Sequence, residues 1–506
     1  MPFRKAAAGL PLGFRYFCHL GTEAGGRSAR AEQSPPPTPP TTHSTFPARK
    51  LFLRGNPIKE RTRIVLYYIL RPLARAALSV YFRKIYLTGL ENIPKGKPVI
   101  LASNHPTAFV EPCILAAWIR DRRLYFLARG DFYLKSPFMA RLYKWLGIIP
   151  VFRLKDGGYG HLKDNFNSFE ACFDALNQGK TILILAEGGA SFEKRLRPLR
   201  KGTARIVYGT LKKYGELDIQ IVPVGVTYTA ADRFRSEALL DVGKPIAARQ
   251  FYPTLRSNPV EGMKKITHLL ELEMRLRVLH IQNPEDDELT ERLLEMFRND
   301  RPQRWWPFRS ADKGRLSMEQ GIVEYVNTLP NEEKERLRKR VELYFQSLKE
   351  LGINDFGLMH PNYLSWKNCA FLALGWVPYL IGYALNILPL WVARWLGFRV
   401  VREKTFQPPV AITAGLLAYL LYWLLLFGGA LLSGEPVLLL GVVALPFLGL
   451  YALYYRELWT KWRWAWWADA IPEEEERKLR SLRAEILDLV RGGKAAHLSP
   501  QAVKGK

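Results

Sequence analysis

The chain is long and strongly basic, and both properties limit what it can be. Its 506 residues exceed what one ordinary core buries, so we expect two or three structural units. Its formal net charge of +27 implies an anionic partner, either nucleic acid or a membrane surface. Uncharged runs rich in Trp, Tyr and Leu in the last third favour the membrane, and no nucleic-acid-binding motif is present. The cysteines are scattered, which favours a reducing compartment and supports neither a disulfide framework nor a zinc site. They are Cys18, Cys113, Cys172 and Cys369.

The first residues and the segment after them differ in composition. Residues 1–50 contain a Ser-, Thr- and Pro-rich stretch at 34–42 that cannot bury a core, so we predict a disordered extension. In residues 51–87, Arg and Lys alternate with Leu, Tyr and Phe at helical spacing from 59 to 86. This pattern predicts a basic amphipathic helix at a membrane interface. The alternative is a helix that packs on the domain after it.

Residues 88–258 alternate short apolar runs with helical patterns, which is typical of an α/β domain. We predict a mixed sheet flanked by helices. Its strand candidates are residues 98–103, 123–128, 148–152, 181–186 and 219–226. Residues 259–368 are charged and helical in pattern, which predicts a solvated helical insertion without visible chemistry.

Residues 369–465 form a predicted membrane region. Residues 411–432 and 437–455 are uncharged runs of spanning length, separated by a turn without Lys or Arg. Basic residues flank the pair on both outer sides, which predicts a two-pass hairpin with both ends cytoplasmic. An earlier apolar run, 370–392, contains two prolines, and we expect it to be re-entrant or interfacial. Residues 466–506 form a charged C-terminal tail with a soluble helix from 472 to 490.

The segment Asn104-His105 ends the first strand candidate, and Glu111 follows six residues after the histidine. Open α/β sheets place their chemistry just past the carboxyl ends of strands. A helix that starts after Pro106 could bring Glu111 back to the imidazole, and a carboxylate that orients a histidine makes it a general base. The alternative is a histidine that merely caps this helix.

Three further strand ends carry candidate residues. Arg153 follows the strand candidate at 148–152 and offers a donor fork suited to a phosphate or carboxylate. Glu187-Gly188-Gly189 follows 181–186; its glycines let backbone N–H groups approach an anion, and Glu187 could hold an arginine or the acceptor. Lys201 then starts a helix and adds a cation. Pro223 lies in the run Val-Pro-Val-Gly that ends the last strand candidate.

Together these motifs, in this order, resemble the glycerolphosphate/lysophosphatidate (1-acylglycerol-3-phosphate) acyltransferase superfamily over residues 85–250. The spacing of six between His105 and Glu111, and the trailing hydrophobic segments, resemble the variant found in Bacteroidetes-type bacteria. The resemblance implies that His105 is the catalytic base and that Glu111 replaces the family's usual aspartate. It also implies that Asn104, Arg153, Glu187, Gly188, Gly189 and Lys201 bind substrate.

One departure from the family pattern concerns the acceptor. Gly189-Ala190 stands where the family has Thr-Arg, so one phosphate-binding side chain is missing. Lys194, Arg195 or Lys201 could supply that charge. Alternatively, the acceptor lacks a phosphate.

The resemblance implies a membrane-bound acyltransferase of phospholipid biosynthesis. It would move a fatty acyl group from acyl-CoA or acyl-carrier protein (acyl-ACP) to a hydroxyl of glycerol 3-phosphate or lysophosphatidic acid. Such a reaction needs an imidazole base but no cofactor and no metal. The expected partners are membrane lipids and these substrates, with no nucleic acid. We expect a cytoplasmic (inner) membrane location with the catalytic domain on the cytoplasmic face. The alternatives are an O-acyltransferase for another lysolipid, such as an amino-acid-containing lipid, and a non-catalytic lipid-binding scaffold.

Overall fold

The structure is a computed structural model of the chain, and it describes residues 57–129, 136–151, 162–300, 302 and 305–497. The predicted disordered extension, Cys18 and Arg153 lie outside these residues.

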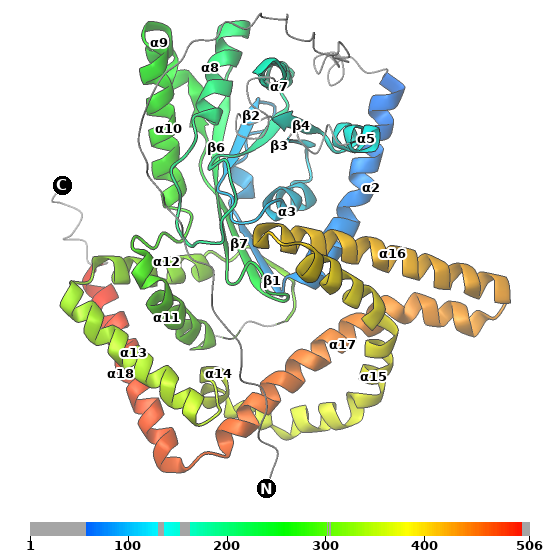
Figure 1. Cartoon of the computed structure of the whole chain (residues 1–506), viewed down its shortest axis with the longest axis vertical. Helices are drawn as coiled ribbons and strands as arrows, with labels where there is room; N and C mark the ends of the chain where they lie inside the picture. Colours follow the sequence, from blue (N-terminus) through cyan, green and yellow to red (C-terminus); the bar gives the residue numbers. More distant parts are fainter. Residues whose placement is uncertain (1–56, 130–135, 152–161, 301, 303–304, 498–506) are drawn as a thin grey trace, which may run out of the picture. The chain divides into compact units, whose positions relative to one another are not determined.

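A mixed sheet carries the α/β unit, as the sequence predicts (Figure 1). In the described residues its strand order is β4-β3-β5-β2-β6-β7-β1-β9, and β8 pairs with β6. The strands are β1 (Lys84–Thr88), β2 (Val99–Ser103), β3 (Leu124–Arg129), β4 (Ile148–Val151), β5 (Thr181–Leu185), β6 (Gln220–Tyr228), β7 (Glu237–Val242), β8 (Ile246–Ala247) and β9 (Arg309–Ser310). All pairs are parallel except β6 with β7 and β6 with β8. Each of the five strand candidates is a strand in the structure.

Alternate residues of the central strands supply two separate cores. Val99 and Leu101 of β2 join one buried cluster, and Ile100 and Ala102 join the other. This is the two-residue period of a strand buried on both faces. The first cluster includes side chains of α2 (Pro57–Tyr81) and α3 (Val110–Trp118), with Tyr143 of α5 (Pro137–Leu146). The second includes side chains of α7 (Leu162–Asn177), α8 (Gly202–Tyr214), α9 (Tyr252–Ser257) and α10 (Pro259–Arg275).

The basic segment before the domain is shorter as a helix than its pattern predicts. The helical interpretation of 59–86 is wrong at its end, because α2 stops at Tyr81 and β1 begins at Lys84. All five residues of β1 are buried between β7 and β9, so sheet pairing outweighs the helical spacing there. One face of α2 packs on α3, where buried Arg71 donates to the carbonyl of Ala116 and Leu78 joins the cluster that contains Val110 and Ile114. On the other face, Val65 and Ile69 are each 56% exposed. The helix therefore packs on the domain, as the alternative holds, and still presents apolar residues. Its membrane contact stays a prediction.

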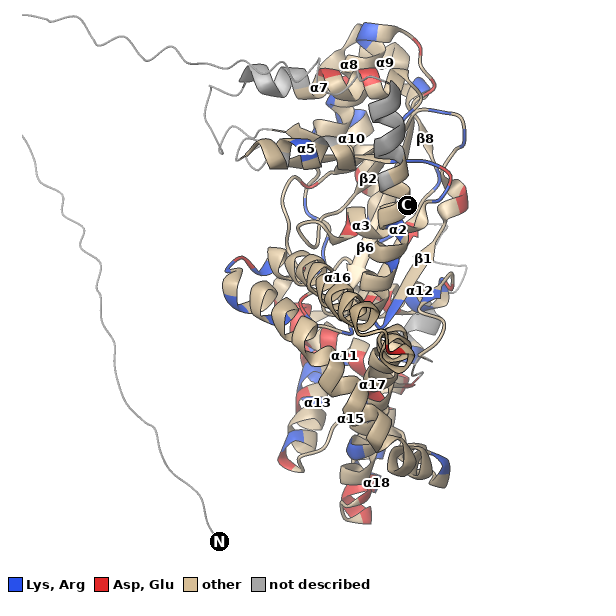
Figure 2. Ribbon diagram, turned by 90° about the vertical axis from the view of Figure 1, so that its right-hand side faces the viewer, with Lys and Arg blue, Asp and Glu red and all other residues tan. Residues whose placement is uncertain are grey.

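The charged region after the α/β unit builds a core of its own, which the expectation of a solvated insertion missed. It contains α11 (Asp287–Asp300), α12 (Gly314–Thr328), α13 (Asn331–Glu350) and α14 (Asp355–Met359). Leu293, Ile322 and Tyr344 are fully buried, and Tyr86 of β1 packs against the same cluster. The tail helix α18 (Glu473–His497) completes this core through Ile486 and Val490, so it is not an isolated helix. Figure 2 shows the charged residues of these helices beside the mostly uncharged α15 and α16.

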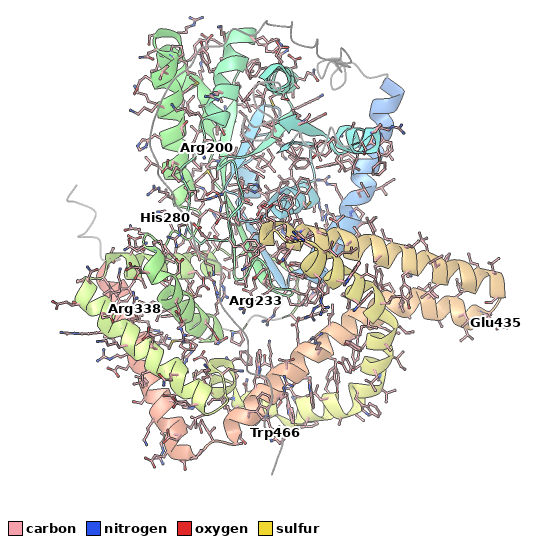
Figure 3. All side chains as sticks on the ribbon, viewed as in Figure 1. Arg200, Arg233, His280, Arg338, Glu435 and Trp466 are labelled. Carbon is pink, nitrogen blue, oxygen red and sulfur yellow. The ribbon has the colours of Figure 1, made fainter. Side chains whose placement is uncertain are left out.

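In the part of the chain that the structure describes, three helices are long and apolar enough to cross a membrane: α15 (Trp366–Arg394), α16 (Gln407–Ser433) and α17 (Pro436–Asp469). The helices α16 and α17 form a hairpin with Glu435 at its tip (Figure 3). Trp423 donates a hydrogen bond to the carbonyl of Val442 across this hairpin (3.0 Å). Despite Pro378 and Pro389, α15 is one continuous helix. Its placement as a re-entrant or interfacial segment stays a prediction, as does the topology of the hairpin.

Candidate active site

The carboxyl ends of β2 and β5 lie side by side, and the two loops that leave them form the candidate site. We call residues 104–109 the histidine loop and residues 186–201 the glutamate loop. Ser103 pairs with Leu185, and the N–H of Ala186 donates to the carbonyl of Ser103 (2.8 Å). The Ser191 N–H donates to the carbonyl of His105 (3.1 Å). The two predicted motifs therefore meet at one edge of the sheet.

Asn104 fixes the start of the histidine loop. Its side-chain amide donates to the carbonyl of Val226 on β6 (2.8 Å), and its oxygen accepts from the N–H of the same residue (2.7 Å). The amide thus extends the sheet by one pair of hydrogen bonds and directs the chain into the loop. Both ends of this buried side chain are engaged with backbone, so its direct effect is to position His105. Its predicted contact with substrate stays a prediction.

The ring of His105 faces the carboxylate of Glu111. The His105 Nδ1 atom lies 3.9 Å from Glu111 Oε2, and both atoms are buried with no hydrogen-bond partner among the described residues. The side chain of Glu111 is fully buried, whereas that of His105 is 13% exposed. A carboxylate at Nδ1 favours the tautomer that carries its proton there and leaves Nε2 able to accept one. Catalytic hydrogen bonds are often long before substrate binds, so this separation suits a base awaiting its acceptor.

The second oxygen of Glu111 explains how a buried carboxylate is held in place. Glu111 Oε1 accepts from the N–H of Thr107 (2.7 Å), the hydroxyl of Thr107 (2.9 Å) and the hydroxyl of Tyr228 (3.4 Å). These donors compensate for the loss of water around the charge. Burial raises the pKa of Tyr228 well above its ordinary value, and nearby Glu111 raises it further, so the phenol remains a donor.

Thr107 also accepts a hydrogen bond from the first backbone N–H of α3. The N–H of Val110, the first residue of that helix, donates to the Thr107 hydroxyl (3.1 Å). Thr107, rather than His105, therefore supplies this hydrogen bond at the start of α3. No sequence motif pointed to Thr107 or Tyr228. Thr107 lies four residues before Glu111, and Tyr228 lies four residues after Val224, the β6 partner of Ser103.

Glu187 links the two loops. Its Oε2 atom accepts from the N–H of His105 (2.8 Å), and its Oε1 atom accepts from the N–H of Arg197 (2.8 Å). The guanidinium of Arg197 lies 3.3 Å from Oε2 and also donates to the carbonyl of Gly189. Of the two expected roles of Glu187, the structure shows the one in which it holds an arginine. Gly188 adopts φ +72°, a left-handed conformation that suits glycine, at the turn after Glu187.

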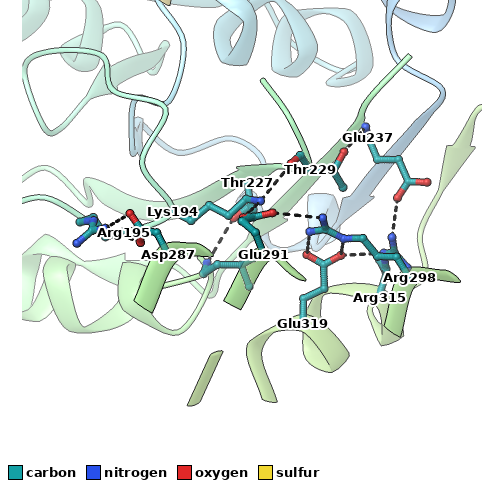
Figure 4. A network of polar contacts seen from close by, with 11 residues as sticks. Lys194, Arg195, Thr227, Thr229, Glu237, Asp287, Glu291, Arg298, Arg315 and Glu319 are labelled. Atoms are coloured by element: carbon teal, nitrogen blue, oxygen red, sulfur yellow. Dashed lines mark hydrogen bonds and ion pairs between the residues drawn. The ribbon is translucent and has the colours of Figure 1, made fainter. Parts of the chain in front are cut away.

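The basic residues of the glutamate loop divide into two groups. Lys194 pairs with Glu291, and Arg195 with both oxygens of Asp287 (2.6 Å each); both acids lie on α11 (Figure 4). These cations are therefore engaged by the helical region, which argues against their replacing the missing phosphate ligand.

Arg197, Arg200 and Lys201 are the other group, and the first two lie at the Glu-Gly-Gly turn. The side chain of Arg197 is 30% exposed, and those of Arg200 and Lys201 are exposed. A Cβ placed on Gly188 would lie 3.0 Å from Cγ of Arg200, so Arg200 covers this glycine. Lys201 immediately precedes α8, where the sequence predicts a helix start. The sequence interpretation overlooked Arg197 and Arg200, although the string Arg-Leu-Arg-Pro-Leu-Arg-Lys carried the signal.

Pro223 is buried on β6 and pairs with Ala102, so it contributes to the sheet beneath the site. Among the residues that the structure describes, no group of three His, Cys, Asp or Glu side chains could hold a metal ion.

Comparison with known proteins finds a family match within the α/β unit. The family profile named Acyltransferase matches residues 84–227, from the start of β1 almost to the end of β6. This match agrees with the predicted resemblance of residues 85–250 to the glycerolphosphate/lysophosphatidate acyltransferase superfamily. The matched span contains His105, Glu111, Glu187 and Arg197 but none of the candidate membrane helices.

The curated relatives match only part of this chain. It is 31% identical over 117 residues to glycerol-3-phosphate O-acyltransferase 2 of Saccharomyces cerevisiae, covering 22% of this chain and 16% of the relative. It is 23% identical over 292 residues to glycerol-3-phosphate O-acyltransferase 1 of the same yeast, covering 42% and 38%. The chain thus spans well under half the length of these relatives. Among solved structures, it is similar to the 1-acyl-sn-glycerophosphate acyltransferase PlsC of Thermotoga maritima, with 19% identity and a TM-score of 0.30 over 44% of this chain and 86% of that one.

Proposed function

We propose that this acyltransferase moves a fatty acyl group from a thioester to a hydroxyl of glycerol 3-phosphate or lysophosphatidate in phospholipid biosynthesis. The observation that carries the proposal is the pairing of His105 with Glu111 beside the arginine of the glutamate loop. A lipid-binding scaffold has no need of a buried acid aimed at a histidine.

In the proposed reaction, Nε2 of His105 accepts the proton of the acceptor hydroxyl. The oxygen of that hydroxyl attacks the thioester carbonyl, the carbon–sulfur bond breaks, and the thiolate leaves with the proton returned from the imidazole. Glu111 stabilises the imidazolium formed in between, because its carboxylate lies next to Nδ1. Acyl-CoA and acyl-ACP are both suitable donors, and no further cofactor takes part.

The proposal also concerns which residues bind the phosphate of the acceptor. Arg197 and Arg200 lie at the turn that follows β5, Lys201 follows them in sequence, and the Ser191 N–H bond brings this turn to the carbonyl of His105. A phosphate there would lie near the base and meet two guanidinium groups suited to its geometry. We propose that Arg197 takes the place of the family arginine that is absent at Ala190. Arg153 is proposed to contribute as the resemblance implies.

The membrane location is likewise a proposal. Three apolar helices follow the catalytic unit, and its lipid substrates partition into membranes. Positive charge flanking the hairpin supports a cytoplasmic membrane with the catalytic unit on the cytoplasmic face. An acceptor without a phosphate, such as an amino-acid-containing lysolipid, is the second candidate. The replacement of Thr-Arg by Gly189-Ala190 favours it.

A transfer assay tests both candidates. Membranes containing the wild type or His105→Ala would receive labelled acyl-CoA or acyl-ACP with glycerol 3-phosphate, lysophosphatidate or unphosphorylated lysolipids. We expect transfer to a phosphorylated acceptor that depends on His105. Transfer only to unphosphorylated acceptors would establish the second candidate, and equal activity in His105→Ala would refute the assignment of the base.

A further inference from the structure

The connector between the first two apolar helices touches the histidine loop. We define the connector as residues 395–406, between the end of α15 and the start of α16. The carbonyl of Thr405 in this connector accepts a hydrogen bond from the N–H of Ala108 (3.0 Å). Ala108 lies three residues after His105, a stretch of chain that spans at most about 10 Å. The connector therefore borders the candidate active site. This contact is made from far outside the matched family profile, because Thr405 lies 178 residues beyond its last residue, 227 (405 − 227).

Packing fixes the connector in this position. Ala411, at the start of α16, is 5% exposed and belongs to the same buried cluster as Val110 and Ile114 of α3. Phe398 of the connector packs against that cluster as well. Gly397 approaches Ala411 so closely that a Cβ on the glycine would lie 2.5 Å from the Cβ of the alanine. This contact seats the connector on the catalytic unit and leaves no room for a side chain between them.

The connector and the last residue of α15 form a cationic surface. It comprises Arg394, Arg399, Arg402 and Lys404, all exposed, and its only acid is Glu403, so its net charge is +3 (4 − 1). Among the described residues, none of these four cations forms an ion pair. Lys194 and Arg195 of the glutamate loop, in contrast, are neutralised by acids of α11. Clustered unpaired cations repel one another and attract phosphate groups. Arg402 and Lys404 are the two cations nearest in sequence to Thr405.

We propose that the connector is a wall of the acyl-transfer site and that Arg402 and Lys404 bind phosphate groups of its substrates. This inference rests on the proposed function. Two sources share the chemistry: the phosphates of coenzyme A and the phosphate of a lysolipid in the membrane surface. Cations that served only to anchor the helices to anionic lipid would need no hydrogen bond to the histidine loop.

Charge removal is the first test. Arg402→Gln, Lys404→Gln and the double variant would be purified with the wild type in nanodiscs of neutral lipid, which removes general attraction to an anionic surface. Lys367→Gln is the matched control, because Lys367 is an exposed cation at the opposite end of α15. We expect KM to rise about fivefold for each connector cation removed, as one cation near an anionic surface contributes about 1 kcal/mol. Lys367→Gln should leave KM unchanged.

Varying one substrate at a time identifies the source of the phosphate. A rise in KM for acyl-CoA alone assigns the connector to the donor, and a rise for lysophosphatidate alone assigns it to the acceptor. Equal KM values for both substrates in the double variant and in Lys367→Gln would overturn the inference. Absence of any transfer by the wild type would instead overturn the proposed function, so the two failures are distinguishable.

A steric variant tests the wall independently of charge. In Gly397→Ala the new methyl group collides with Ala411, so the connector and the start of α16 must move apart, and we expect this to disturb the contact with the histidine loop. Gly441→Ala is the control, because a Cβ at that glycine of α17 meets no atom within 4 Å. We expect kcat to fall at least fivefold in Gly397→Ala and to stay at the wild-type value in Gly441→Ala. Equal kcat in the two variants, with both proteins folded as judged by monodisperse gel filtration, would contradict the proposed wall.

Discussion

The histidine loop and the glutamate loop leave neighbouring strands, but different parts of the chain hold them. The histidine loop is fixed mainly from within the matched family span, where Asn104 binds Val226 and Thr107 binds Glu111. Tyr228, one residue beyond the span, also binds Glu111. The glutamate loop is fixed at its start by Glu187 and then from outside that span. The helix α11 pairs with Lys194 and Arg195.

This difference suggests that the histidine loop serves the proposed proton transfer and that the glutamate loop serves binding of the acceptor. The candidate base and its acid are held mainly by residues of the α/β unit, with one further hydrogen bond to their loop from Thr405 of the connector. The loop that carries the phosphate-binding candidates depends on a helical region that the family profile does not cover. Substitutions in the first loop should therefore lower kcat, and substitutions in the second should raise KM for the acceptor.

The largest expected effect comes from the base. In His105→Ala the rate of acyl transfer should fall on the order of 10²–10⁴-fold, the usual contribution of a general base. KM for either substrate should change little, because the ring contributes proton transfer more than binding. Initial rates with labelled acyl-CoA measure the loss. His268→Ala, on α10, is the control and should retain full activity. A His105→Ala variant that keeps more than a tenth of the rate would break the assignment.

Removing the charge of the acid comes next. Glu111→Gln keeps the acceptor oxygen for Thr107 but cannot stabilise an imidazolium at Nδ1. We expect kcat to fall about 10–100-fold, since a hydrogen bond to a charged group contributes about 1.5–3 kcal/mol. Tyr228→Phe should lower kcat only a few-fold, because its hydroxyl lies 3.4 Å from the carboxylate and Thr107 still supplies two donors. A loss in Tyr228→Phe as large as that in Glu111→Gln would show that the phenol acts on the reaction directly.

The sequence predicted the catalytic edge better than its surroundings. Hydrophobic runs identified five strands, and their polar ends identified His105, Glu111 and Glu187, because these signals are local in sequence. Strand β1 was missed because its Lys-Ile-Tyr-Leu-Thr sequence continues the helical spacing of α2, and only pairing with β7 makes it a strand.

Contacts between distant segments could not be predicted. Nothing in the sequence indicates that Lys194 meets Glu291 or that Thr405 meets Ala108, since these pairs are 97 and 297 residues apart (291 − 194 and 405 − 108). The expectation that Lys194 or Arg195 replaces the missing arginine assumed that a cation near the motif is available. Pairing with α11 uses both cations for structure instead, and Arg197 is the guanidinium left at the turn.

The glutamate loop offers a smaller test. Arg197→Gln should raise KM for a phosphorylated acceptor about tenfold, because a charge-assisted contact to phosphate is lost. KM for acyl-CoA should stay constant, and Arg197→Lys should restore part of the affinity. Arg205→Gln, an exposed arginine on α8, serves as the control. Equal effects of Arg197→Gln on phosphorylated and unphosphorylated acceptors would show that Arg197 only supports Glu187.

The smallest expected effect is a change of stability with pH, through a hydrogen bond that His280 makes to the glutamate loop. The N–H of Leu196 donates to Nδ1 of His280 (3.0 Å), a bond that requires this nitrogen to be unprotonated. Burial lowers the pKa of His280, and the nearby cations Arg275 and Arg195 lower it further. Because the unfolded chain binds this proton more readily than the folded one, stability falls as the pH drops below the ordinary histidine value towards the lowered one. The melting temperature of the wild type should therefore fall between pH 7.5 and pH 5.5, and His280→Gln, which keeps a hydrogen-bond acceptor without titrating, should fall less. If both proteins lose the same number of degrees, the loop is not held through this nitrogen.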